Sequence, residues 1–185
     1  DRYFLRQAAP DAVRARFEQI AAAMAIHCLE HDGPEYYVAS VGSGAAIDVR
    51  EALVALPQEC RRRIRVRLLD LDPNALEFAT RNIAPLLPPG ALSCVRANLY
   101  RLPQRSNSNE ILQRPDFLVC SGLFDYLADE PAIGMLRLFW DQLARGGMLL
   151  VGNFAPHNPT RAYMEWIGNW YLLYRTADEL ELLAT

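Results

Sequence analysis

The sequence predicts an α/β domain with a doubly wound, mainly parallel sheet and an N-terminal helix. Five apolar, strand-like segments alternate with segments of helical periodicity, and this alternation is typical of right-handed βαβ units. A glycine-containing turn follows the first strand, and an acidic residue ends the second. With 185 residues, half of them apolar, the chain can bury the core of one such domain.

The predicted elements follow from this periodicity. After Pro10, apolar residues recur at intervals of three or four as far as Cys28, which predicts an amphipathic helix that ends at Gly33-Pro34. The strands are predicted at 36–41, 64–70, 91–96, 116–121 and 147–153. The later helices are predicted at 45–56, 73–84, 129–144, 160–174 and 176–184.

Composition excludes several classes of function. The net charge of −3 gives no general attraction to nucleic acid or to an anionic membrane. The arginine-rich segment 61–67 invites a nucleic-acid interpretation, but its second half alternates arginine with apolar residues, as a strand with one solvated face does. No segment approaches the ~20 apolar residues of a membrane span, and no signal peptide opens the chain. We therefore expect a cytoplasmic protein without an integral membrane segment. Because the first residue is Asp1, we also expect an excerpt of a longer protein.

Cysteine and histidine spacing gives no metal site. The four cysteines form no C-x-x-C pair, which argues against a zinc ribbon or a thioredoxin-type site. Cys94 and Cys120 lie in strand patterns, so we expect reduced core cysteines. His27 and His31 stand four residues apart on the predicted N-terminal helix, but no third ligand is evident. The prediction is therefore that no metal is bound.

The glycine turn and the acid after the second strand predict a nucleoside-bearing cofactor. Gly42 and Gly44 allow a tight turn and a close approach of the backbone to a ligand. Asp70 stands where a carboxylate can bind both hydroxyls of a ribose. The alternative is that the glycines serve only the turn, and that Asp70 and Asp72 cap the helix that begins at Pro73.

In an open parallel sheet the ligand lies beyond the carboxyl ends of the strands. Small or polar residues end all five predicted strands, which is a stronger signal than any one of them. These strand ends are Ser40–Ala46, Asp70–Asp72, Ala97-Asn98, Ser121–Tyr126 and Asn153–His157.

The core of the sequence resembles the class I methyltransferases that use S-adenosylmethionine (SAM). The likeness covers roughly residues 36–154. It includes small residues at 42, 44 and 46, the acid Asp70, Asn98 after the third strand, and the turn at 143–150 before the fifth. The resemblance implies a Rossmann-like fold, SAM as cofactor and S-adenosylhomocysteine (SAH) as product.

The resemblance also assigns roles in cofactor binding. It implies that Asp70 binds the ribose, that Leu71 packs on the adenine, and that Asn98 reaches the adenine amino group. The family usually has an acid where this chain has Ser40, and Asp48 is a candidate electrostatic substitute. The predicted cofactor-binding residues are Ser40, Gly42, Ser43, Gly44, Asp70, Leu71, Asn98, Ser121, Gly122 and Tyr126.

Alternatives remain for single residues and for the function. Asn98 can equally be a turn residue. Ile47 stands where the fingerprint of nicotinamide-dependent enzymes wants Gly or Ala, so an NAD-binding oxidoreductase is disfavoured. A non-catalytic SAM-binding or regulatory module is the other alternative, because Ser40 departs from the family pattern.

A narrower resemblance covers the acceptor side. Segments 121–127, 151–161, 163–166 and 174–176 look like bacterial methyltransferases of extracellular-factor biosynthesis, which make 3-hydroxy fatty acid methyl esters. This resemblance implies a small-molecule acceptor, for which the carboxylate of a 3-hydroxy fatty acid is the candidate. The Asn-Pro-Pro-Tyr signature of enzymes that methylate amino groups of nucleic acids and proteins is absent, so no nucleic-acid partner is expected.

The candidate catalytic residues are Asp125, His157, Asn153 and Arg161. A fatty acid carboxylate, with a reference pKa near ~4.3, is already ionised and needs no base. It needs a cradle, which Arg161, His157 and Asn153 can supply. A hydroxyl or amine acceptor needs a base, for which Asp125 or His157 is available. Tyr126 can face the sulfonium through a cation–π contact. The alternative is that Asp125, Asn153 and His157 only cap loops.

We expect three regions: an N-terminal helical cap (1–33), a SAM-binding core (34–154) and acceptor-side helices (155–185). Aromatic residues at helical spacing in 160–174 pack in the core or line an acyl pocket. Strands six and seven of the methyltransferase sheet have no counterpart in this sequence. The fifth strand is then an exposed apolar edge, through which a homodimer can form.

Overall fold

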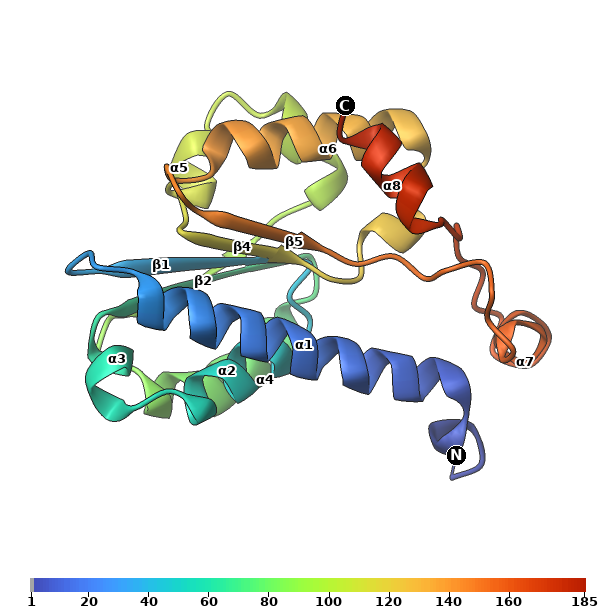
Figure 1. Ribbon diagram of the computed structural model, residues 1–185, viewed down its shortest axis with the longest axis horizontal. Coiled ribbons are helices and arrows are strands. Elements are labelled where there is room, and N and C mark those ends of the chain that lie inside the picture. Colours follow the sequence, from blue (N-terminus) through green and yellow to red (C-terminus); the bar gives the residue numbers. More distant parts are fainter. Residues whose placement is uncertain (1) are drawn as a thin grey trace.

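The computed structural model describes residues 2–185 and shows a five-stranded, all-parallel sheet between two layers of helices (Figure 1). The sheet order is β3-β2-β1-β4-β5, so the direction of winding reverses between β1 and β4. The α/β, parallel fold class predicted from the sequence is confirmed. The strands are β1 (Tyr36–Val41), β2 (Ile64–Asp70), β3 (Leu92–Arg96), β4 (Phe117–Cys120) and β5 (Met148–Val151).

The helices alternate with the strands, as the sequence predicts. The α-helices are α1 (Ala8–Glu30), α2 (Ile47–Ala55), α3 (Gln58–Arg62), α4 (Pro73–Ile83), α5 (Ser108–Leu112), α6 (Asp129–Gln142), α7 (Arg161–Trp166) and α8 (Ala177–Leu183). The 3-10 turns are η1 (Phe4–Arg6), η2 (Ala84–Leu86), η3 (Leu99–Gln104) and η4 (Phe124–Tyr126).

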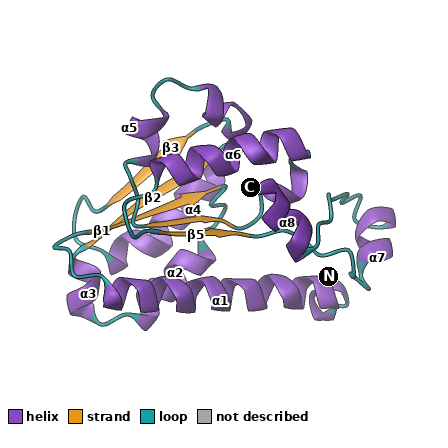
Figure 2. Ribbon diagram, turned by 45° about the horizontal axis from the view of Figure 1, so that its top comes forward, coloured by secondary structure: helices purple, strands orange, loops and turns teal. Residues whose placement is uncertain are grey.

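Each face of the sheet is covered by its own hydrophobic cluster. Successive residues of β1 alternate between the clusters: Val38 packs with α1, α2 and α4, whereas Ala39 packs with η3, α5 and α6. Figure 2 shows the long α1 on one side of the sheet and α6 on the other. Because both faces are buried, the backbone ends of the strands remain as the place for a ligand.

The predicted helix 160–174 is wrong in its second half. α7 ends at Trp166, and Asn169 has a left-handed backbone with φ of +48°. The N–H of Trp170 bonds to the carbonyl of Met164 at 2.9 Å, which closes the helix end. Gly168-Asn169 is a helix stop signal, so the predicted helical stripe of Tyr163, Trp166, Trp170 and Tyr174 does not form.

The segment from Phe154 to Leu172 packs on the N-terminal end of α1 instead of on the sheet. Met164, Phe154 and Leu172 form a small cluster with Ala9. Figure 1 shows α7 standing apart from the two helical layers, near the N-terminal end of the chain. This third cluster lies on the side of the molecule to which the carboxyl ends of the strands point.

Three smaller outcomes concern single residues. Cys120 is buried, as predicted for a core cysteine, but Cys94 is exposed because β3 is an edge strand. In β2 the apolar residues Ile64, Val66 and Leu68 are buried, whereas Arg65 and Arg67 are half-buried, so the face with the arginines is only partly open to solvent. α2 begins at Ile47, two residues later than predicted, because Ala46 has a left-handed backbone with φ of 49°.

Two findings bear on membranes and on the sheet edge. Among residues 2–185, no helix is both long enough and apolar enough to cross a membrane.

β5 lies at the edge of the sheet, with all four residues half-buried. Pairing of this edge with a second copy stays a prediction.

Candidate functional site

The turn after β1 has a backbone that glycine favours and faces open space. Gly42 has φ of +67° and Gly44 has φ of +50°. A methyl group built on Gly44 meets no atom within 4 Å. The N–H groups of Gly42 and Ser43 bond to the carbonyl of Leu69 at 2.8 and 3.1 Å, which ties the turn to β2. The Gly44 side of the turn is therefore fixed in place and bare.

Asp70, at the end of β2, holds this turn. Its Oδ2 accepts a hydrogen bond from the N–H of Gly44 at 2.7 Å, and its Oδ1 accepts one from the N–H of Asp72 at 2.9 Å. A carboxylate can accept about four hydrogen bonds, so Asp70 keeps capacity for two hydroxyls. Asp72 caps α4 through a 2.9 Å bond from Asn74 N–H, which confirms its capping interpretation.

A pocket of about 310 Å³ opens at the carboxyl ends of the strands. It brings together residues that follow β1, β2, β3 and β4, including six of the ten that the sequence predicts to bind a cofactor. The lining residues are Gly42, Asp70, Leu71, Asn98, Leu99, Tyr100, Gly122, Leu123 and Tyr126. Leu99, Tyr100 and Leu123 were missed, although each lies within two residues of a predicted residue.

Large apolar side chains are unusually exposed in this pocket. Leu71 is 55% exposed, Tyr100 54% and Tyr126 46%. Three such side chains around one concave site leave an apolar surface that a flat ring can cover. Asn98 caps η3, with its Oδ1 accepting from Tyr100 N–H at 3.1 Å. The turn interpretation of Asn98 is therefore confirmed, and its position in the pocket is compatible with a second role.

The remaining predicted cofactor residues lie behind or beside the pocket. Ser40 is 3% exposed within β1, and Ser121 is half-buried after β4. The hydroxyl of Ser43 is buried in the glycine turn and has no hydrogen-bond partner among residues 2–185. Such buried orphan groups are uncommon in folded proteins.

Asp125 lies at the other half of the same edge, on η4. Its Oδ1 accepts hydrogen bonds from the N–H of Phe154 at 2.6 Å and from Asn153 Nδ2 at 3.1 Å. Its Oδ2 lies 3.9 Å from Nη1 of Arg16. Burial raises the pKa of Asp125 from 3.8 to about 6, although the Phe154 bond and the arginines Arg16 and Arg175 oppose the shift.

Asn153, the second predicted catalytic residue, is bound to the protein through both ends of its amide. Its Nδ2 donates to Asp125 and to the carbonyls of Phe154 and Leu173, at 3.1, 3.1 and 2.7 Å. Its Oδ1 accepts from Nη1 of Arg175 at 2.9 Å. The side chain of Asn153 therefore links the segment after β5 to the segment before α8.

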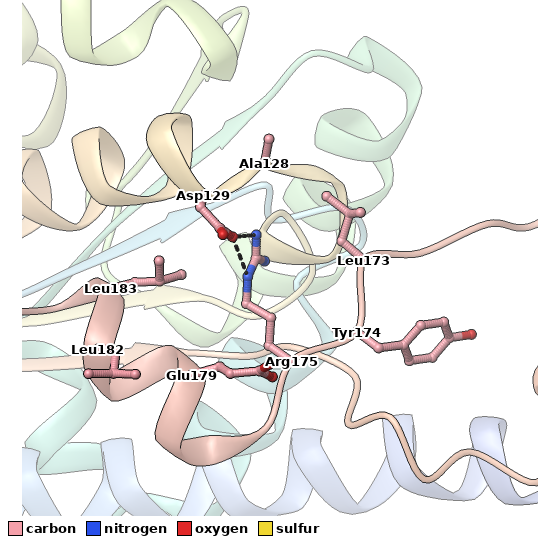
Figure 3. A pocket seen from close by; sticks show the side chains of 8 residues that line it. All are labelled: Ala128, Asp129, Leu173, Tyr174, Arg175, Glu179, Leu182 and Leu183. Atoms are coloured by element: carbon pink, nitrogen blue, oxygen red, sulfur yellow. Dashed lines mark hydrogen bonds and ion pairs between the residues drawn. The ribbon is translucent and has the colours of Figure 1, made fainter.

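Arg175 completes this network and was not predicted. It is 7% exposed, and its guanidinium donates to the carbonyls of Phe124 and Leu127 and, through two nitrogens, to Asp129. Figure 3 shows the pair with Asp129 at the wall of a second pocket, lined by residues of α8 and of the segment before it. An arginine in an extended segment carries no sequence signal of such a role.

His157 and Arg161 lie away from this network. His157 is exposed, and the exposed Arg161 pairs with Glu165 at 2.7 Å and lies 4.5 Å from the ring centroid of Tyr174. Within the described residues, the structure joins Asp125 to Asn153 and neither of them to Arg161 or His157. None of the four predicted catalytic residues lines the 310 Å³ pocket.

The two helical histidines have structural partners. His27 shares hydrogen bonds with the hydroxyl of Tyr36 at 2.8 Å and with the carbonyl of Gly146 at 3.1 Å. His31 lies 3.1 Å from the carbonyl of Glu35. In the part of the chain that the structure describes, no group of three His, Cys, Asp or Glu side chains could hold a metal ion.

Comparison with protein-family models finds no match, and comparison with curated proteins finds none either. Comparison with solved structures finds similar folds. A possible exported protein from Bordetella parapertussis aligns with a TM-score of 0.77 and 23% identity, over 98% of this chain and 63% of that one. The chain thus spans less than two thirds of that protein.

Other similar structures are methyltransferases. Magnesium protoporphyrin IX methyltransferase from Synechocystis PCC 6803, with bound SAH, gives a TM-score of 0.63 at 14% identity, over 91% of this chain and 70% of that one. Human N-acetylserotonin methyltransferase in complex with SAM gives 0.54 at 14% identity, over 80% of this chain and 40% of that one. The chain therefore has the α/β fold of Rossmann-like methyltransferases, with a parallel five-stranded sheet and an N-terminal helix.

Proposed function

We propose that this protein binds S-adenosylmethionine at the pocket beside Gly42 and Asp70 and transfers its methyl group to a small-molecule acceptor. The observation that carries the proposal is the convergence of four strand ends on this pocket. It combines a bare glycine turn, a carboxylate with spare acceptor capacity and exposed apolar side chains. Similar folds with bound SAM and SAH support the same cofactor.

The residues present fit the parts of this cofactor. Asp70 would accept the two ribose hydroxyls while it keeps its bonds to the turn. Leu71 offers an apolar surface to the adenine ring, and Asn98 offers an amide to its amino group. The open space at Gly44 leaves room for polar groups of the ligand near the turn. When bound, the cofactor supplies a methyl group on an electrophilic sulfonium.

The acceptor side favours a nucleophile that needs no base. Of the two candidate bases, Asp125 already accepts hydrogen bonds from Asn153 and Phe154, and His157 is exposed away from this network, so neither is well placed to take up a proton from an acceptor. A carboxylate is ionised at neutral pH and only needs alignment and exclusion of water. This agrees with the proposed acceptor, the carboxylate of a 3-hydroxy fatty acid. The proposed acceptor region comprises the N-terminal end of α1 and residues 155–185.

A second candidate function is that of a non-catalytic SAM-binding module. It is favoured by one observation, that the predicted catalytic groups of Asn153 and Arg161 are held by partners within the chain. The two functions share the pocket and differ only in methyl transfer.

Calorimetry with SAH and with NAD tests the binding proposal. We expect SAH to bind and NAD not to bind, and the reverse order would contradict the pocket assignment. Transfer of labelled methyl from SAM to 3-hydroxy fatty acids then separates the two functions. A protein that binds SAH and labels no acceptor among hydroxy acids, hydroxyl compounds and amines would favour the binding module.

A further inference from the structure

Arg16, on α1, reaches from the N-terminal helix to the carboxyl ends of β4 and β5. Its side chain packs on Gly152, where an added Cβ would lie 3.1 Å from both Cδ and Nη1 of the arginine. Its guanidinium carbon lies 5.7 Å from the ring centroid of Phe154, and its Nη1 lies 3.9 Å from Asp125. α1 thereby places a cation at the edge of the sheet where the proposed site lies.

The hydrogen bonds of this guanidinium are incomplete. The Arg16 side chain is 22% exposed, its Nε is buried, and this atom has no partner among residues 2–185. Its ion pair with Asp125 is long at 3.9 Å. Arg175 is different, because its Nε, Nη1 and Nη2 all donate direct hydrogen bonds. Burial lowers the pKa of Arg16, so the charged group lies where an additional anionic partner would stabilise it.

Arg16 lies next to the proposed pocket, whose lining includes Asp70 but not Arg16 itself. Asp125, which Arg16 faces, belongs to the same short turn as the pocket-lining Tyr126. The guanidinium of Arg16 is also attracted by the carboxylate of Asp48 at the start of α2, just after the glycine turn. In the sheet order, Asp70 ends β2 and Arg16 contacts the ends of β4 and β5, with β1 between them.

We propose that Arg16 binds a carboxylate of the ligand in this site, an inference that rests on the proposed function. Two carboxylates are chemically possible: the amino-acid end of the cofactor and the carboxylate of the acceptor. A planar guanidinium can bind either one through two parallel hydrogen bonds. The long pair with Asp125 would then give way to a shorter one with the ligand. Arg161 pairs with Glu165, and the amide of Asn153 is bound within the chain. If the carboxylate is that of the acceptor, Arg16 takes the role that the sequence suggested for those two residues.

The test compares Arg16→Gln with Arg14→Gln. Arg14 lies on the same helix, is exposed, and pairs with Asp11, so its replacement controls for a change of charge on α1. Calorimetry measures the binding of SAH and of 5′-methylthioadenosine, which keeps the nucleoside and lacks the amino-acid end. A third titration adds 3-hydroxydecanoate to the protein saturated with SAH. Thermal unfolding confirms that each variant is folded.

If Arg16 binds the cofactor carboxylate, Arg16→Gln weakens SAH about 10- to 100-fold and leaves 5′-methylthioadenosine unchanged. If it binds the acceptor carboxylate, the variant weakens 3-hydroxydecanoate alone. Should Arg16→Gln fail to fold, Arg16→Lys is used instead, because it keeps the charge without the planar fork. We expect it to weaken the same ligand by a smaller factor.

Other outcomes overturn the assignment. Equal losses for SAH and 5′-methylthioadenosine mean that Arg16 only supports the fold, and values equal to those of Arg14→Gln for all three ligands mean that it binds no carboxylate. Wild-type protein that binds neither nucleoside overturns the proposed function itself. That result can be told apart from the two variant outcomes, because it is seen with the wild-type protein before any variant is made.

Discussion

At the carboxyl ends of β1 and β2 the polar groups face a pocket, whereas at the ends of β4 and β5 they bind one another. Asp70 uses two backbone N–H groups and keeps acceptor capacity beside open space. Asn153 uses both ends of its amide, and Arg175 uses all three guanidinium nitrogens.

The difference shows what a polar residue after a strand can mean. Both halves of the edge carry such residues, but those that follow β1 and β2 keep hydrogen-bonding capacity for a ligand, whereas in the β4–β5 half the group that keeps such capacity is Arg16, which comes from α1. The β4–β5 half uses its capacity to hold the chain after β5 against the turn after β4. This division predicts that variants of one half change binding, and that variants of the other change stability.

The largest expected effect is on stability, from Arg175→Met. The change leaves the carbonyls of Phe124 and Leu127 and the Oδ1 of Asn153 without their donor, and we expect a loss of about 3–5 kcal/mol. Chemical denaturation measures this loss. Arg81→Met, at an exposed pair with Glu77, is the control and should cost less than about 0.5 kcal/mol. Equal losses in the two variants would contradict the structural role of the network.

The next effect is a pH dependence of stability from Asp125. Burial raises the pKa of Asp125 in the folded protein from 3.8 to about 6, so the folded state binds this proton more tightly than the unfolded state. Stability from this group is therefore fully present below pH ~4 and falls as the pH rises to ~6. Relative to Asp125→Asn, the wild-type free energy of unfolding should decrease by about 2–3 kcal/mol over this window. Parallel profiles for the two proteins would show that Asp125 titrates normally.

A smaller effect, on binding, is expected from Asp70→Asn. The amide lacks the charge and half of the acceptor capacity, so SAH affinity should fall by about 1–3 kcal/mol in calorimetry. The control is Asp72→Ala, which removes the cap of α4 and should cost about 1 kcal/mol of stability without changing affinity. If both variants bind SAH as the wild type does, the ribose lies elsewhere.

The smallest expected effect comes from a comparison of two glycines that both have a positive φ. Gly44 and Gly90 both have positive φ, +50° and +79°, and an added Cβ meets no atom within 4 Å at either one. Alanine at each should therefore cost about 1 kcal/mol of stability. Only Gly44→Ala should also weaken SAH, by about tenfold, since its methyl would occupy the space of the ligand. Equal SAH affinity in the two variants would mean that the glycine turn faces solvent.

Much of the fold was predictable because it depends on local periodicity. All five strands lie where alternation of apolar and helical segments places them, within two residues at each end. The second half of the predicted helix 160–174 failed because Gly168-Asn169 ends the helix, a stop signal that the aromatic spacing obscured. The prediction that Cys94 is buried in the core was wrong because β3 is an edge strand. Strand order, and hence which strand lies at an edge, is set by tertiary contacts.

The candidate site likewise contains residues that the sequence predicts and residues that it does not. Gly42, Asp70 and Asn98 could be found because each lies at or just after the end of a strand, and the carboxyl ends of parallel strands meet on one side of the sheet. Arg16 and Arg175 could not be found from the sequence. One lies on a helix and the other in an extended segment, and only the folded chain brings them to the network around Asp125.

The structure of the protein with bound SAH tests the central claim most directly. We predict that the nucleoside lies across the ends of β1 and β2, with both ribose hydroxyls on the carboxylate of Asp70 and the adenine against Leu71. A nucleoside bound at another edge of the sheet, or a ribose without contact to Asp70, would contradict this account.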